Sequence, residues 1–148
     1  MPDGRLGLLD YGMVGRLSAE DTETVAKVVL ALSQNNKKEA ARLYRDGGYR
    51  ATWREGAIVD DAILHRFATI HLDKFDLSPI TMEGGDKVDT ISLFRSLRER
   101  AVPIWISEAA RLGGLLMGVS AQAARPISLS KEWAPIAAQT LENKKRRR

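Results

Sequence analysis

The residues best suited to chemistry lie close to the N-terminus, where an apolar stretch ends in an acidic residue. The apolar run at 6–9 is followed directly by Asp10, Tyr11 and Gly12. A short strand there would fix the backbone, so that the carboxylate of Asp10 projects from the strand end. The ring of Tyr11 can pack back into the core, and Gly12 lets the chain reverse direction. This order of residues suits a metal site.

The three residues alone recur by chance in many proteins, but the longer string around them is more specific. Residues 8–18 read Leu-Leu-Asp-Tyr-Gly-Met-Val-Gly-Arg-Leu-Ser. This string resembles the hallmark of the UbiB / aarF-domain-containing (ADCK) atypical kinase-like family. Asp10-Tyr11-Gly12 matches the family's Asp-Phe-Gly, and residues 13–17 match the segment after it. Tyr11 keeps the aromatic ring of that Phe and adds a hydroxyl.

The resemblance implies that Asp10 is a ligand of the Mg²⁺ that bridges ATP phosphates, with Gly12 supporting the nucleotide-binding loop. It assigns no residue of this chain to catalysis, because the family's catalytic loop and nucleotide-binding lobe would precede Asp10. Phosphoryl transfer needs a phosphate cradle, metal ligands and a group that positions the nucleophile, all together. We therefore expect Mg²⁺ and ATP to bind only in the context of a complete kinase domain. The chain alone is expected to be inactive.

The resemblance also implies the fold, which is mainly α: the C-lobe part of a protein-kinase-like domain, as a helical bundle with one short N-terminal β-strand or hairpin. Residues 1–142 would form this partial kinase-like domain, and residues 143–148 a disordered basic tail. The family's role lies in coenzyme Q or other prenyl-lipid metabolism. A membrane surface or a prenyl lipid is therefore a further candidate partner, and the mitochondrion or plastid is the expected compartment if the protein is eukaryotic.

Capping residues and helical spacing of apolar residues predict six helices. Ser18 is expected to cap the first, and Asn35 or Asn36 the second, which ends at Gly47-Gly48. The third helix is expected to begin near Asp60, the fourth to cover 88–97, and the sixth to begin at Ser128 or Ser130. The fifth is expected to begin at Pro103 and to carry a buried stripe of Trp105, Ala109, Leu112 and Leu116. Residues 49–57 are expected to be irregular, and residues 76–86 to form a loop.

Charge and composition restrict the function classes. Five of the 23 Lys and Arg residues lie at 144–148, so the rest of the chain has 18 basic and 19 acidic residues. A nucleic-acid-binding domain usually carries its positive charge on a folded face, so nucleic acid is not an expected partner. The chain has no cysteine, which excludes disulfides, thiolate zinc sites and a cysteine nucleophile. The sequence shows neither a signal peptide nor a stretch long enough to span a membrane.

Two other patterns are given structural interpretations. His65 and His71 are six residues apart, which places them on different faces of a helix and disfavours a shared metal site. Gly114 and Gly118 are expected to allow close packing between helices. The alternative to the kinase hypothesis is a catalytically inert helical module that binds a protein partner or a membrane surface. A weaker third hypothesis is a helical protein that binds nucleic acid through its basic tail.

Overall fold

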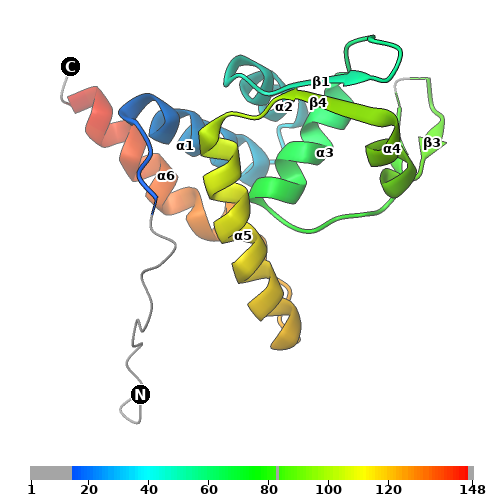
Figure 1. The fold of residues 1–148 in the computed structure, drawn as a ribbon. Helices are drawn as coiled ribbons and strands as arrows, with labels where there is room; N and C mark the ends of the chain where they lie inside the picture. Colours follow the sequence, from blue (N-terminus) through cyan, green and yellow to red (C-terminus); the bar gives the residue numbers. More distant parts are fainter. Residues whose placement is uncertain (1–14, 83, 147–148) are drawn as a thin grey trace.

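The computed structural model describes residues 15–82 and 84–146, and within them the chain is mainly helical (Figure 1). The helices are α1 (Ala19–Ser33), α2 (Lys37–Asp46), α3 (Asp61–Leu72), α4 (Thr90–Ser96), α5 (Ile104–Gln122) and α6 (Leu129–Arg146). The short strands are β1 (Arg50–Trp53), β2 (Ile80–Thr81), β3 (Lys87–Val88) and β4 (Leu97–Ala101). The mainly α class is confirmed. The strand expected at 6–9 lies outside the described residues.

Polar caps begin the helices where the sequence predicts them. Ser18, Asn36 and Asp60 each accept a hydrogen bond from the backbone N–H three residues further on, at 3.0, 3.2 and 3.1 Å. These bonds satisfy N–H groups that have no partner within the helix. Asn36 rather than Asn35 is therefore the cap of α2, and Asn35 instead adopts a left-handed turn with φ of 54°.

Residues 49–57, which the sequence predicts to be irregular, contain strand β1. β1 pairs with β4 in antiparallel orientation, from Arg50 opposite Ala101 to Trp53 opposite Leu97. β4 reads Leu-Arg-Glu-Arg-Ala and is mostly exposed. Its sequence lacks the alternation of apolar and polar residues that indicates a strand. The fourth helix is correspondingly shorter than expected, because residue 88 lies in β3 and residue 97 begins β4.

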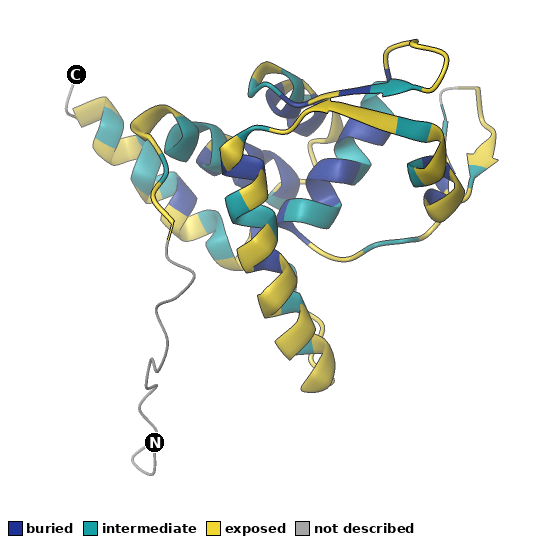
Figure 2. Cartoon of the chain, viewed as in Figure 1, coloured by how far each residue is buried: buried dark blue, intermediate teal, exposed yellow. Residues whose placement is uncertain are grey.

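The core has a large and a small part (Figure 2). The large part joins α1, α2, α3 and α5 around stacked and edge-on aromatic rings. Trp105 is 1% exposed, meets Tyr44 edge-on at a centroid distance of 5.5 Å, and donates from Nε1 to the carbonyl of Gly47 at 2.8 Å. The small part lies between α1 and α6, where Ala26 and Val29 pack with Ala137.

The α6 helix is longer than the sequence predicts. It continues to Arg146, so residues 143–146, expected to belong to a disordered tail, form its last turn. Lys144 in that turn pairs with Glu23 of α1, and Lys27 pairs with the same carboxylate at 2.8 Å. Because one basic side chain of the tail is bound to α1, the last turn of α6 lies against α1 rather than apart from it.

The α5 helix is buried only in its first half, and Figure 1 shows its second half projecting beyond the other helices. Leu112 and Leu116, expected on a buried stripe, are 52% and 37% exposed. The glycine prediction is also wrong, because nothing lies within 4 Å of a Cβ placed at Gly114 or Gly118. Gly113 makes the close contact instead, where a Cβ would lie 2.9 Å from the carbonyl oxygen of His71. Within 15–82 and 84–146, no helix combines the length and hydrophobicity that crossing a membrane requires.

Candidate functional site

Asp10 and Gly12, the residues expected to bind Mg²⁺ and nucleotide, lie outside the described residues. The described chain begins at Gly15, three residues after Gly12. A Cβ at residue 15 would lie 2.5 Å from Oε2 of Glu108 on α5, so the backbone passes close to that side chain. Leu17 packs against the large core, and Ser18 caps α1. Residues 15–18 therefore pass beside α5 before α1 begins.

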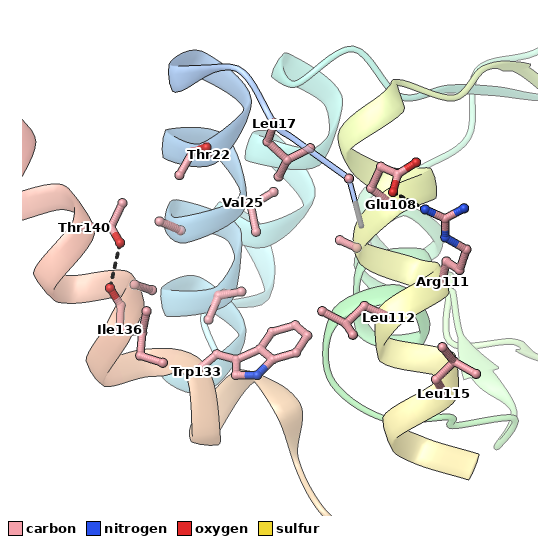
Figure 3. A pocket seen from close by; sticks show the side chains of 15 residues that line it. Leu17, Thr22, Val25, Glu108, Arg111, Leu112, Leu115, Trp133, Ile136 and Thr140 are labelled. Carbon is pink, nitrogen blue, oxygen red and sulfur yellow. Dashed lines mark hydrogen bonds and ion pairs between the residues drawn. The ribbon is translucent and has the colours of Figure 1, made fainter. Parts of the chain in front are cut away.

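An apolar groove of about 610 Å³ lies at this point, between α1, α5 and α6 (Figure 3). The α1 and α6 helices form one wall and α5 forms the other, with Trp133 facing Leu112 across the space. The groove, called the apolar groove below, is lined by Gly15, Leu17, Thr22, Val25, Ala26, Val29, Glu108, Ala109, Arg111, Leu112, Leu115, Trp133, Ile136, Ala137 and Thr140.

The threonine, glutamate and arginine side chains of the apolar groove already make hydrogen bonds or an ion pair within the protein. The hydroxyls of Thr22 and Thr140 each donate to a backbone carbonyl four residues earlier in their own helix, both at 2.8 Å. Glu108 and Arg111 pair with each other on α5. The interior therefore offers methyl, methylene and indole surface, which suits an apolar side chain or a hydrocarbon group rather than a charged ligand.

A second cleft, of about 550 Å³, is polar and lies between the start of α2, α3 and the segment leading to β2. Its largest charged side chain, Arg66, pairs with the Asp76 carboxylate at 2.6 Å and donates to the Asp76 carbonyl at 2.9 Å. His65 lies in this cleft, and burial, with the positive charges of Lys37 and Arg66, holds its pKa below the usual value.

The two histidines lie in different surroundings. His71 contacts the large core instead of the polar cleft: its ring hydrogen-bonds the hydroxyl of Tyr44 and stacks near Phe67, with a centroid distance of 6.1 Å. Burial holds the pKa of His71 below its usual value. Among the residues that the structure describes, no group of three or more His, Asp or Glu side chains is arranged to hold a metal ion.

Sequence reasoning missed the apolar groove. Leu112 and Ile136 each fit a helical pattern of core residues, and period alone does not show whether another element covers that face. The exposure of Leu112, Leu115 and Ile136, at 52%, 50% and 65%, appears only once the helices are placed.

The comparisons with known proteins add nothing to the sequence resemblance. No protein-family model, no curated protein and no solved structure matches this chain.

Proposed function

We propose that this chain is the C-terminal helical part of a UbiB-like atypical kinase or ATPase domain, with a role in coenzyme Q or prenyl-lipid metabolism. Asp10 is the carboxylate that binds the Mg²⁺ of Mg-ATP, and Gly12 supports the loop that carries it. The observation on which the proposal depends is the string at 8–18, in which the Asp-Tyr-Gly motif is followed six residues later by Ser18, the cap of α1.

The described residues support this proposal in two ways. First, the motif is followed closely by a fixed anchor, because Ser18 caps α1 and Leu17 packs on the core. A metal ligand works best when rigid elements position it. Second, a helical body that normally packs against further parts of a domain should leave apolar side chains uncovered. Leu112, Leu115 and Ile136 meet that expectation beside the point where the motif ends.

The first test reads the coding DNA upstream of Met1. The proposal expects an open frame that encodes a lysine-bearing nucleotide lobe and a catalytic loop with a second metal-binding Asn. The protein that includes this frame should gain thermal stability from Mg-ATP, because a ligand that binds only the folded state raises the free energy of unfolding. Asp10→Asn should abolish that gain, whereas Asp3→Asn, the same change seven residues earlier, should leave it intact.

Two results would contradict this reading. If a stop codon closes the upstream frame and a promoter lies between it and Met1, no nucleotide-binding lobe is encoded together with this chain. Micromolar affinity of the isolated chain for ATP, measured by calorimetry, would show that the lobe is not needed.

The exposed leucines of α5, Leu112 and Leu115, favour a second candidate function. In this function the chain is an inert helical module that binds a protein partner or a membrane surface. Contiguous apolar surface on a monomer marks interaction sites. Sedimentation with phosphatidylcholine and phosphatidylserine vesicles tests the membrane form. If the module binds a membrane surface, the chain should sediment with the vesicles, and Leu112→Asp and Leu115→Asp should each weaken this binding. A chain that stays in the supernatant would contradict membrane binding.

A further inference from the structure

The polar cleft between the start of α2, α3 and the segment leading to β2 is lined by more positive than negative charge. Its volume of about 550 Å³ lies within the range of small-molecule sites. Three carboxylates and four cationic side chains line it, and the cations are Lys37, Lys38, Arg66 and Lys74.

Each of the three carboxylates already has partners within the described chain. Asp61 pairs with Arg45 of α2, which lies outside the lining of the cleft. Asp76 pairs with Arg66 at 2.6 Å. The carboxylate of Asp73 is buried and is bound by serines at the start of α6. The acidic side chains are therefore not arranged to neutralise the lysines.

The three lysines of the cleft make no ion pair among the residues that the structure describes. Lys37 and Lys38 begin α2 and Lys74 follows α3, so they come from two segments that are distant in the sequence. The first turn of a helix disfavours positive charge, so two of the lysines occupy a position that costs stability. Departures from local rules of this kind are typical of functional sites. Against the single uncompensated carboxylate, that of Asp73, the lysines leave an excess of two positive charges.

The half-buried ring of His65 responds to the charge inside the cleft. Burial lowers the pKa of His65, and the positive charges of Lys37 and Arg66 lower it further. The negative charges of Asp73 and Asp76 raise this pKa, but each has a smaller effect than either cation. The surroundings of the ring are therefore positive on balance, and a bound anion would be stabilised there.

We propose that the polar cleft binds the phosphate group of a phosphate monoester, held by Lys37, Lys38 and Lys74. A phosphate monoester has a charge of about −1.5 to −2 at pH 7, which matches the excess of positive charge. Ammonium groups form strong, charge-assisted hydrogen bonds with phosphate oxygens. Ile80 and Met82 add apolar surface to the same cleft, so an ester with a small apolar group fits it better than inorganic phosphate. This binding is independent of the nucleotide role proposed above.

The sequence has two histidines, which allows a direct measurement on the full chain. Proton NMR follows the pH titration of each imidazole ring, and a His65→Gln variant, which lacks one signal, assigns the two. Phenyl phosphate is the soluble probe and should bind saturably. It should move the titration midpoint of His65 upward, because a nearby negative charge favours the protonated ring. The midpoint of His71, which contacts the large core through Tyr44 and Phe67, should stay in place.

Substitutions of single lysines identify the site. Lys37→Gln and Lys74→Gln should each weaken the binding of phenyl phosphate by about tenfold, as for the loss of one charge-assisted hydrogen bond. The matched control is Lys131→Gln, which removes the same charge from an exposed position of α6 outside the cleft and should leave the affinity unchanged. Circular dichroism checks that each variant is folded, and sodium chloride at equal ionic strength controls for screening.

Vesicles of phosphatidylcholine with phosphatidic acid present the same chemical group on a lipid. Sedimentation with these vesicles that Lys37→Gln and Lys74→Gln weaken, without binding of phenyl phosphate, would support the site and assign its phosphate to a lipid headgroup. Absence of saturable binding to both probes would overturn the proposal. So would a His65 midpoint that sodium chloride moves equally, or a loss of affinity in Lys131→Gln as large as that in Lys37→Gln.

Discussion

The carboxylate of Asp73 accepts two hydrogen bonds from Ser130, one from its backbone N–H at 3.2 Å and one from its hydroxyl at 2.7 Å. Ser128 donates to the same oxygen, and the carbonyl of Asp73 accepts from the N–H of Leu129 at 2.9 Å. Asp73 lies just after α3 and the serines lie at the start of α6. One carboxylate thus joins two helices that are distant in the sequence, and it fixes where α6 begins its course along the apolar groove.

Replacing Asp73 removes the acceptor that buried Ser130 needs. Asp73→Ala should lower the free energy of unfolding by about 2–3 kcal/mol, because buried donors lose a charged partner. Asp73→Asn keeps one acceptor oxygen and should cost less. Urea denaturation at neutral pH measures both. A loss below about 0.5 kcal/mol for Asp73→Ala, the usual range of surface substitutions, would show that α6 is held in place by its apolar face alone.

Two neighbouring glycines should respond to alanine in opposite directions. Gly113→Ala places a methyl group 2.9 Å from the backbone oxygen of His71, so α3 and α5 must separate. Overpacking of this kind costs about 1–3 kcal/mol. Gly114 faces open space, and Gly114→Ala should stabilise the helix by up to about 1 kcal/mol through helix propensity alone. Thermal unfolding of the pair tests this, and equal shifts would contradict the close approach of α5 to α3.

The buried histidine near Tyr44 should make stability fall on mild acidification. Burial lowers the pKa of His71, so below its ordinary value near 6.5 the unfolded chain binds more protons than the folded one. The stabilisation is complete above that value and declines as the pH falls toward the lowered pKa. His71→Gln keeps a partner for Tyr44 without titrating, and its free energy of unfolding should decline less between about pH 7 and pH 5.

The His65→Gln variant separates the two histidines, because burial also lowers the pKa of His65. Each single variant should remove part of the pH dependence, and the double variant more than either. An unchanged slope in both single variants would contradict the role of the histidines.

The contact between α1 and α6 should weaken in stronger acid and in salt. Hydrogen bonds from Lys144 and Lys27 lower the pKa of Glu23 to about 2. This stabilisation is therefore present above the ordinary value near 4.5 and is lost as the pH falls toward 2. Lys144→Met should reduce both the acid dependence and the salt dependence of unfolding. Lys145→Met, one residue further along, has no ion pair among the described residues and serves as the control.

The sequence was a good guide to helix starts because their determinants are local. Ser18, Asn36 and Asp60 each bond to a backbone group within three residues, which spacing alone can reveal. β4 could not be predicted in this way. Its stability comes from pairing with β1 and from contacts such as Tyr49 with Glu99 at 2.8 Å, between residues that are distant in the sequence.

The candidate site was predictable only in its chemistry. The string around Asp10 suggests a metal ligand, but the residues that line the apolar groove come from three helices whose order in space is a tertiary property. Leu112 and Gly114 show the difficulty most clearly, since the sequence assigns each to a packed face and both are exposed. Where a helix has an apolar stripe, only its neighbours determine whether that stripe is core or interface.

The pairing of α1 with α6 has a consequence for synthesis on the ribosome. The chain emerges from its N-terminus, so α1 is made early and the helix that covers Ala26 and Val29 is the last described element to appear. Until then that face of α1 is open to water and to other chains, which is the condition under which nascent proteins aggregate or recruit chaperones. Changes that slow elongation late in the message should therefore lower the yield of folded protein without altering its final stability.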